Sequence, residues 1–436
     1  MVSKDIIKNL LLVRNKMSDL PSSQHNLGAL SAELVKKGQD YYVPNYKPRE
    51  MILDHGKGSR VWDLDGNEYI DLAAGIAVSS LGHQDPDLLA AMDAQSRKLW
   101  HTSNVFFTEP PIKLCEALVN SVDWAKRVYL CNSGTEANEA AIKLVRKYAA
   151  DKGKSPAQRN IISFNGSFHG RTLAAVTLTA QPKYQQGYEP LPGGFIYCDR
   201  FNDEAAITAL VDANTCAIFV EPVQGEGGVM PAAPGFLKHL RALCDKVGAL
   251  LVVDEIQSGL GRSGALYAHE IDGVVPDVMT LAKGLGGGIP IGAMVVGEKA
   301  EQTFQFGSHG STFGGNPVMA AVGLAALTKL NDKKLLSEVE RKGNLLRLAL
   351  TTMNETLDMF VEVRGRGLMI GAELKPPYAG NANAISDAAR KAGVLVLVAG
   401  PNVLRFLPPL TITDDELAEG MKRLKPALEA AKEDIK

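Results

Sequence analysis

The sequence predicts an α/β protein with a large, mainly parallel β-sheet covered by helices on both faces, and a smaller α+β domain. From about residue 73 to residue 300, short apolar runs rich in β-branched residues alternate with segments of helical periodicity. This alternation is typical of a parallel sheet whose crossover connections are helices. After residue 316, long helical segments come first and short strands follow. The chain has 436 residues, more than one hydrophobic core usually supports.

We therefore expect three parts. Residues 1–72 form an N-terminal segment that packs with the small domain, residues 73–322 form the large domain, and residues 323–436 form the small domain. Residues 1–17 are expected to be an extension without an assigned function, because their apolar run is too short for a signal peptide.

The elements follow in chain order from periodicity and turn residues. In the N-terminal segment we expect a helix over 30–37 that ends at Gly38, and strands over 51–53, 60–63 and 69–72, the last two joined by an Asp-Gly turn. In the large domain we expect helices over 86–99, 111–119 and 135–148, and strands over 128–131, 161–164, 174–178, 195–198, 217–221, 250–254, 278–282 and 293–296. Beyond these we expect helices over 317–330, 334–353 and 414–431, and strands over 361–374, 394–398 and 403–407.

Composition excludes several classes of protein. A net charge of −2 gives no electrostatic footprint for nucleic acid, and no apolar run approaches the length of a membrane helix. Five cysteines at wide, irregular spacing indicate free thiols in a reducing compartment, so we expect a cytoplasmic protein. The histidines form no close ligand pair, so we expect no metal.

Lys283 is the first candidate for chemistry. It follows a buried strand and is followed by a run of glycines that lets a bulky group approach the backbone. A partly desolvated lysine has a lowered pKa, which makes its amine a nucleophile suited to a Schiff base. The alternative is a lysine that reaches from the strand end to solvent.

Asp254 ends another apolar strand. A carboxylate there is costly to bury without a cation. A Walker-B acid is excluded because the chain has no P-loop, which leaves a partner for a pyridinium nitrogen or a helix cap.

The residues NSGTEAN at 132–138 join a strand to a helix. Ser133, Gly134 and Thr135 would present free backbone N–H groups at the helix N-terminus, which is an anion site. Ser133 and Glu136 also match a capping box, and the two interpretations are compatible.

A weaker motif, G-x-G-x-x-G at 259–264, raises the alternative of a nicotinamide-dependent dehydrogenase, although it lies five residues beyond its strand.

Arg171 and Arg405 are two further candidates. Their sequence surroundings suit arginines that bind a substrate carboxylate or that form structural ion pairs. Glu226, in a glycine-rich loop, would pair with one of them or face solvent.

Together these segments resemble the class III, fold-type I aminotransferases that depend on pyridoxal phosphate. The resemblance runs from about Tyr42 to the C-terminus and depends on motifs in the family's order. They are NSGTEA at 132–137, SFHGR at 167–171, EPVQGEGG at 221–228, VVDEIQSGLGR at 252–262, LAKGLGGG at 281–288, STFGGNP at 311–317 and LRFLPPL at 404–410. The resemblance implies a seven-stranded sheet in the large, cofactor-binding domain and a homodimer.

The resemblance also implies roles for the cofactor site. Lys283 would bind pyridoxal phosphate covalently and move the proton, and Asp254 would pair with the pyridinium nitrogen. Gln257 would bond the ring oxygen and Phe168 would stack on the ring. Ser133, Gly134 and Thr135 would hold the phosphate, with Thr312 reaching the phosphate of the neighbouring subunit.

Within the family the chain is most similar to the acetylornithine branch, including enzymes described as acting on succinyldiaminopimelate, through GIAVSSLGH at 75–83, SNVF at 103–106 and GSHGSTFGGNP at 307–317. This likeness implies that Arg171 binds the distal carboxylate of the donor. Arg405 would bind the α-carboxylate of glutamate or 2-oxoglutarate and be covered by Glu226 otherwise. Tyr46 and Ser311 would also contact substrate.

Ile76 stands where the ornithine branch has a tyrosine, which favours an acylated nitrogen over a free ammonium. We therefore expect transamination of N-acetyl-L-ornithine with 2-oxoglutarate, with succinylornithine, 4-aminobutyrate and ornithine as the alternative donors.

Overall fold

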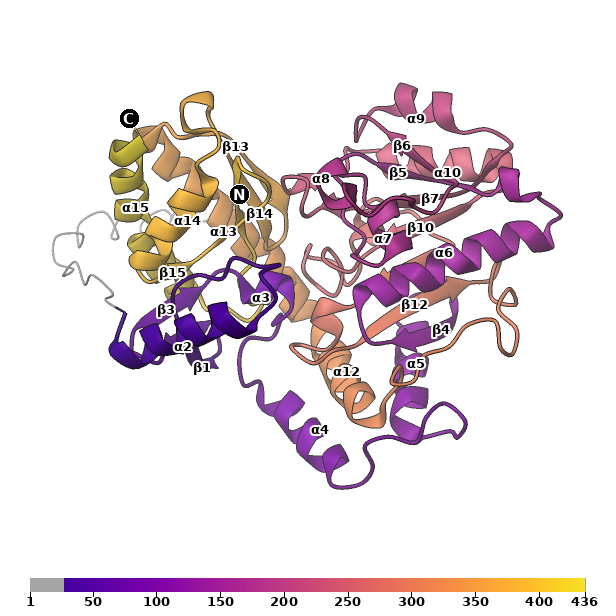
Figure 1. Ribbon diagram of the computed structural model, residues 1–436, viewed down its shortest axis with the longest axis horizontal. Coiled ribbons are helices and arrows are strands. Elements are labelled where there is room, and N and C mark those ends of the chain that lie inside the picture. Colours follow the sequence, from indigo (N-terminus) through magenta and orange to yellow (C-terminus); the bar gives the residue numbers. More distant parts are fainter. Residues whose placement is uncertain (1–26, 436) are drawn as a thin grey trace.

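The computed structural model describes residues 27–435, so the expected extension at 1–17 lies outside the described residues. Figure 1 shows two lobes side by side, a larger one built on a wide sheet and a smaller one that contains both the N-terminal strands and the C-terminal helices. The wide sheet positions the candidate site.

The wide sheet has seven strands in the order β4-β12-β11-β10-β7-β5-β6. Their bounds are β4 Ala125–Cys131, β5 Asn160–Phe164, β6 Phe195–Cys198, β7 Thr215–Val220, β10 Leu250–Asp254, β11 Val278–Leu281 and β12 Gly292–Gly297. All neighbours are parallel except β12, which runs antiparallel to β11 and β4. This confirms the predicted fold class.

Helices cover both faces of this sheet. Successive side chains of a strand point to opposite faces. Leu250 and Val252 accordingly pack with α6 (Gly134–Asp151), whereas Leu251 and Val253 pack with α10 (Phe236–Val247). Because both faces are buried, these strands read as continuous apolar runs in the sequence. The shorter helices of this lobe are α7 Leu173–Leu178, α8 Pro182–Gln185, α9 Glu204–Leu210 and α11 Ala268–Ile271, and a small hairpin joins β8 Val223–Gln224 to β9 Met230–Pro231.

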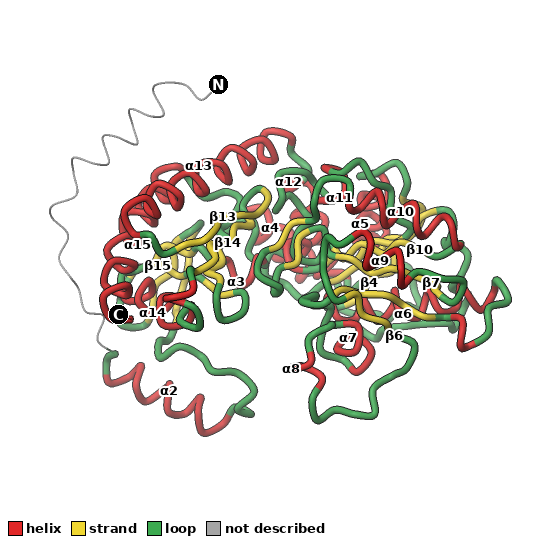
Figure 2. The backbone as a smooth tube through the Cα atoms, turned by 90° about the horizontal axis from the view of Figure 1, so that it is seen from above, coloured by secondary structure: helices red, strands yellow, loops and turns green. Residues whose placement is uncertain are grey.

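The smaller lobe combines the two ends of the chain. One sheet has the order β1-β2-β3-β15 and the other β13-β14-β17-β16. The first pairs N-terminal strands with a C-terminal one, since β3 runs parallel to β15. Figure 2 shows α13 passing along the outer edge of this lobe. The bounds are β1 Leu53–Lys57, β2 Arg60–Asp63, β3 Glu68–Asp71, β13 Phe360–Arg366, β14 Met369–Leu374, β15 Val394–Leu395, β16 Leu397–Val398, β17 Val403–Phe406, α2 Ala29–Tyr41, α13 Lys333–Leu357, α14 Ala382–Lys391 and α15 Asp414–Ile435.

A charged cluster fastens the N-terminal hairpin to α15. Arg60 donates to Glu68 and to Glu419 (both 2.6 Å), and Arg423 donates to Glu68 (2.9 Å). The cluster is half-buried, so its charges are screened less than those of an exposed pair. The expected boundaries at residues 72 and 322 stay predictions.

Helices α3 (Ala74–Ala77), α4 (Pro86–Ser96), α5 (Glu109–Asn120) and α12 (Pro317–Leu330) connect the lobes. α12 packs against α4 and α5, and α5 packs against β4 at the edge of the wide sheet. In Figure 1 α4, α5 and α12 lie below that edge, whereas α3 lies in the smaller lobe. Among residues 27–435 no helix has both the length and the apolar character needed to cross a membrane.

Several element predictions were wrong. Residues 174–178 form helix α7 and not a strand, because a short, fully buried apolar run has no periodicity that separates the two. The expected strand over 361–374 is the hairpin β13–β14, which turns at Gly367 with a φ of 51°. The run 394–398 is divided between two sheets, and the strand expected over 51–53 begins at Leu53. Helix α2 continues past Gly38 to Tyr41.

Candidate active site

The carboxyl ends of β10 and β11 bring the two main candidates together. Asp254 is paired in register with Thr280, so Lys283 follows only three residues beyond the partner of Asp254. Both line a cavity of about 380 Å³ at this edge of the sheet. The other predicted residues that line it are Ser133, Gly134, Thr135, Phe168, Arg171 and Gln257. A ligand site at the carboxyl ends of parallel strands is the rule for such sheets.

Lys283 is partly accessible from the cavity but otherwise enclosed. Burial lowers the pKa of its amine to about 8, although the charge of Glu226 acts to raise it. Its φ of 37° lies in the left-handed region, which costs a non-glycine residue on the order of 1–3 kcal/mol. A neutral amine held in a strained conformation is suited to nucleophilic chemistry.

Asp254 is buried and oriented by two neighbours that sequence reasoning missed. His169 Nδ1 donates to Asp254 Oδ2 (2.7 Å), and Asn138 Nδ2 donates to the same oxygen (2.8 Å). Burial alone would lower the pKa of His169, but the hydrogen bond and charge of Asp254 raise it above the usual value. Two donors therefore hold Asp254 Oδ2 in place beside the cavity. His169 follows Phe168 in the SFHGR motif, so its position beside a predicted site residue was the available signal.

The N-terminus of α6 forms another wall of the cavity. Ser133 is its N-cap, and its Oγ accepts from the N–H of Glu136 (3.3 Å). The N–H groups of Gly134 and Thr135 donate to no group in the described part of the chain. Gly134 is required here because a Cβ would lie 2.8 Å from Ile256 Cδ1. Free N–H groups and a positive helix end make an anion site.

Arg405 and Glu226 form an ion pair next to the cavity. Arg405 Nη1 donates to Glu226 Oε1 (2.5 Å) and to Gln257 Oε1 (3.1 Å). Burial acts to raise the pKa of Glu226, but the charge and hydrogen bond of Arg405 hold it below the usual value. Arg405 Nε is buried and bonds no described group. Gln257 therefore links the arginine to the cavity.

Arg171 is exposed at the mouth of the cavity and stacks on aromatic rings. Its guanidinium lies 3.9 Å from the centre of the Tyr184 ring and 5.4 Å from that of Phe168. No ion pair of Arg171 is found among the described residues, so its charge is available to an incoming carboxylate.

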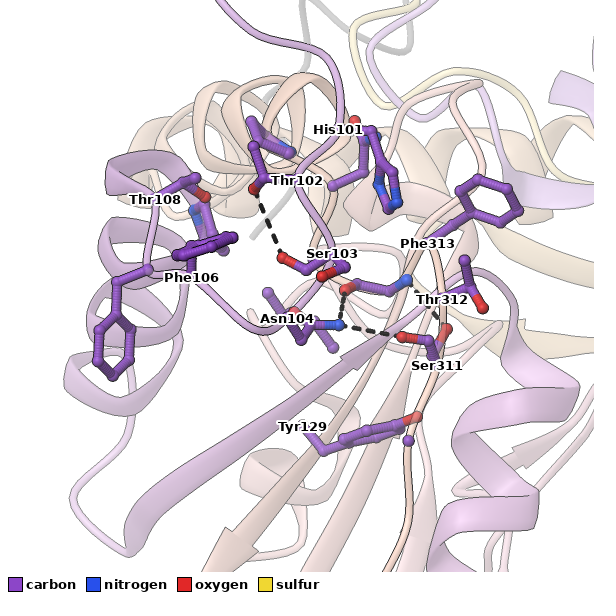
Figure 3. A pocket seen from close by; sticks show the side chains of 18 of the residues that line it. His101, Thr102, Ser103, Asn104, Phe106, Thr108, Tyr129, Ser311, Thr312 and Phe313 are labelled. Carbon is purple, nitrogen blue, oxygen red and sulfur yellow. Dashed lines mark hydrogen bonds between the residues drawn. The ribbon is translucent and has the colours of Figure 1, made fainter. Parts of the chain in front are cut away.

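Besides Arg405 and Glu226, which lie next to this cavity, three other predicted substrate or phosphate contacts do not line it. Ser311 and Thr312 line a second one, of about 500 Å³, which Figure 3 shows together with Asn104, Phe106 and Phe313. Asn104 Nδ2 donates to the carbonyl of Ser311 (3.0 Å). Tyr46 is 82 % exposed, in the segment after α2. Within one chain Thr312 and Tyr46 do not line the cavity of Lys283, and Ser311 reaches it only through Asn132, whose Nδ2 donates to Ser311 Oγ (3.1 Å).

Glu255, the acid that follows Asp254, and the G-x-G-x-x-G loop have structural roles. Glu255 is fully buried and accepts from the N–H groups of Ala268 and His269. In the G-x-G-x-x-G loop, Arg262 is buried and donates to the carbonyls of Leu368 and Pro408. No helix follows this loop directly, as a dinucleotide motif requires, so the loop joins the lobes instead of binding a nucleotide.

Comparison with known proteins identifies the family. Residues 41–428 match the family described as Aminotransferase class-III. The chain is 60% identical over 388 residues to an acetylornithine aminotransferase of Xanthomonas axonopodis pv. citri, covering 89% of this chain and 95% of the relative. It is 48% identical over 386 residues to an acetylornithine/succinyldiaminopimelate aminotransferase of Yersinia pestis, covering 88% and 95%.

A solved structure shows the same fold. The crystal structure of N-acetylornithine aminotransferase from Stenotrophomonas maltophilia K279a superimposes with a TM-score of 0.80 at 51% identity, covering 91% of this chain and 98% of that one. The seven-stranded sheet, the strand-end lysine and aspartate, and these matches agree, and the chain belongs to the class III aminotransferases.

Proposed function

We propose that this aminotransferase uses pyridoxal phosphate to transfer the side-chain amino group of N-acetyl-L-ornithine to 2-oxoglutarate. The products are N-acetyl-L-glutamate 5-semialdehyde and L-glutamate, and the reaction belongs to arginine biosynthesis. The names of relatives at 58–60% identity support the donor. The observation that carries the proposal is the Arg405–Glu226 ion pair next to the Lys283 cavity.

The cavity fits pyridoxal phosphate. The free N–H groups of Gly134 and Thr135 suit its phosphate, Asp254 suits its ring nitrogen, and Lys283 suits its aldehyde. When bound, this cofactor withdraws electrons from the reacting carbon of the substrate and stores the amino group between the two half-reactions.

The residues around the cavity would each have a separate role in binding the cofactor or moving the proton. Asp254, held by His169, would pair with the ring nitrogen and keep it protonated. Phe168 limits the ring from one face. Lys283 Nζ, whose pKa of about 8 leaves part of the amine neutral near neutral pH, would accept the proton from the amine-bearing carbon of the substrate and deliver it to the cofactor carbon. Gln257 orients the ring oxygen while also bonding Arg405.

Two carboxylate sites explain how one cavity handles two substrates. Arg171 is available at the mouth for the α-carboxylate of the donor, which is distal to the reacting amine. Arg405 is neutralised by Glu226 during this half-reaction. When 2-oxoglutarate enters, its α-carboxylate replaces Glu226 on Arg405 and its other carboxylate takes Arg171.

Succinylated donors are the second candidate. The Yersinia pestis relative, at 48% identity, carries succinyldiaminopimelate in its name, and Photorhabdus laumondii has a relative at 48% named succinylornithine transaminase. Ile76, 42% exposed, offers no hydrogen bond to a free ammonium, which favours an acylated nitrogen of either kind.

The site would be completed by a second copy of the chain. Large apolar side chains are strongly exposed beside the cavity that contains Thr312; they are Trp100, Val105, Phe106, Phe107 and Phe313. Such a patch is typical of an interface between subunits. A homodimer would cover it and bring Thr312 and Ser311 to the neighbour's cofactor. Location in the cytoplasm stays a prediction.

A donor panel tests the proposal. The purified protein is mixed with 2-oxoglutarate and, in turn, N-acetylornithine, succinylornithine, ornithine or 4-aminobutyrate, and glutamate is measured by mass spectrometry. We expect the highest kcat/KM with N-acetylornithine. A higher value with ornithine or 4-aminobutyrate would overturn the assigned donor.

A further inference from the structure

Glu221 is a buried carboxylate whose two oxygens hold two different parts of the site. It follows β7 directly, and β7 lies beside β10, so Glu221 and Asp254 occupy neighbouring strand ends. Its Oε1 accepts from the N–H of Phe168 (2.7 Å), and its Oε2 accepts from the N–H of Gly225 (3.0 Å). Glu221 is only 7% exposed. It lines the cavity without having entered the roles described above.

The second contact fixes the loop that carries Glu226. Gly225, Gly227 and Gly228 surround Glu226, and glycines give the backbone little intrinsic stiffness. Glu221 holds the loop at Gly225. At the other end, Arg364 donates to the carbonyl of Gly228 through Nη2 (2.7 Å) and Nε (3.1 Å).

Between these anchors the loop makes few bonds. The N–H groups of Glu226 and Gly227 donate to no group in the part of the chain that the structure describes. The backbone is thus fixed on both sides of Glu226 while the Glu226 side chain reaches Arg405. Packing adds to this, since a Cβ on Gly225 would lie 2.4 Å from Gln257 Nε2.

We propose that Glu221 is a positioning residue for the substrate switch: it fixes Gly225 so that Glu226 covers and uncovers Arg405 by side-chain rotation about a stationary backbone. The same carboxylate fixes Phe168 against the cofactor ring, so the switch and the ring share one anchor. This inference rests on the proposed function, because it assigns a further residue to the exchange of carboxylates on Arg405.

The charges around Glu221 fit this role. The charges of His169 and Asp254 affect the pKa of Glu221, and the charge of Glu221 in turn affects the pKa of Lys283. Burial raises the pKa of Glu221 to about 7, the charge of His169 lowers it and that of Asp254 raises it. Each oxygen of Glu221 accepts one backbone N–H group, and both bonds are strongest when the carboxylate is ionised.

The test measures how the chain binds glutarate, a dicarboxylate that occupies the carboxylate sites but has no oxo group to react. Binding to the holoenzyme is measured by calorimetry for the wild type, Glu221→Gln, Glu226→Ala and the double variant. Glu221→Gln keeps the size of the side chain but replaces one acceptor with an NH₂ group. Glu355→Gln, an exposed carboxylate on α13, is the matched control.

We expect the dissociation constant of glutarate to fall by roughly tenfold in Glu221→Gln, because a loosened Glu226 competes less for Arg405. In the Glu226→Ala background, Glu221→Gln should have no further effect. An equal effect with and without Glu226 would indicate loss of a nearby negative charge and overturn the proposal, and so would no effect in either background.

A second measurement follows the backbone amides of the loop directly. In hydrogen exchange, the amides of Gly225 and Phe168 should be protected in the wild type, while those of Glu226 and Gly227 exchange faster. In Glu221→Gln at least one protected amide should exchange faster, and in Glu355→Gln neither should. Fast exchange of Gly225 in the wild type would overturn the proposal. Failure of the wild type to convert N-acetylornithine would instead refute the proposed function.

Discussion

Lys283 and Asp254 lie at adjacent strand ends, yet their surroundings give them opposite tasks. Burial favours the neutral amine of Lys283, whereas hydrogen bonds from His169 and Asn138 favour the charged carboxylate of Asp254. Lys283 is therefore suited to accept a proton, and Asp254 is suited to keep a neighbouring base protonated. Such separation of acid and base is typical of a catalytic site.

The lowered pKa of Lys283 predicts how covalent binding of the cofactor depends on pH. With a pKa of about 8, roughly one-tenth of the side chains are neutral at pH 7, and the fraction rises toward one above pH 8. The rate at which the apo-protein forms its covalent bond to pyridoxal phosphate should rise with pH, reach half its maximum near pH 8 and become constant above about pH 9. Stopped-flow absorbance measures this rate, and a rise that continues to pH 10 would contradict the assignment.

Glu226→Ala should affect the two half-reactions unequally. Without Glu226, Arg405 stays uncovered and attracts the donor's carboxylate in the wrong orientation. We expect kcat/KM for the N-acetylornithine half-reaction to fall about tenfold and that for the 2-oxoglutarate half-reaction to change much less. Single-turnover kinetics of each half measures the difference. Equal losses in both halves would count against the switch.

At the scale of single residues, the lysine and the aspartate at the strand ends could be predicted, because a charged residue directly after an apolar run is easily recognised in the amino-acid sequence. His169 and Asn138 were missed, because their role depends on a contact with Asp254 across 85 and 116 positions of the chain. Glu221 was missed for another reason. It lies at a strand end, as Asp254 does, but its partners are backbone N–H groups, and every residue except proline has one, so the sequence cannot identify them.

Among the elements, α6 is the one proposed to hold the phosphate, and its N-terminus lies so close to Ile256 that a Cβ on Gly134 would be 2.8 Å from Cδ1. We expect Gly134→Ala to weaken binding of pyridoxal phosphate by about tenfold, because the added Cβ meets Ile256 and displaces the helix N-terminus. Replacing Ile256 with Val in the same chain removes Cδ1 and should recover most of the affinity. Fluorescence titration of the apo-protein measures the change, with Gly38→Ala as control because that position is open. Unchanged affinity in Gly134→Ala would contradict the role of α6.

Element predictions succeeded where an element is long or lies between clear turn signals. Helix α12 begins and ends at the expected residues, and β10 spans the expected five. They failed where burial is complete, as in α7, or where a glycine turn lies inside an apolar run, as at Gly367. In both cases tertiary packing decides a conformation that local periodicity leaves open.

For the whole molecule, a dimer with shared sites predicts complementation between inactive chains. Lys283→Ala removes the amine of its own site, whereas Thr312→Asp places a carboxylate beside the neighbour's phosphate. Unfolding and refolding an equal mixture should restore about a quarter of wild-type activity, since half the dimers are hybrids with one intact site. A mixture of Lys283→Ala and Asp254→Ala chains is the control and should stay inactive. No recovery in the first mixture would contradict a shared site.

The most direct test of the central claim is the visible absorption spectrum of the purified protein, before and after N-acetylornithine is added without an oxo acid. We predict a yellow protein whose colour bleaches as the amino group passes to the cofactor, and returns when 2-oxoglutarate is added. A protein that stays colourless with added pyridoxal phosphate would contradict the cofactor site. A yellow protein that bleaches with ornithine or 4-aminobutyrate but not with N-acetylornithine would keep the chemistry and contradict the donor.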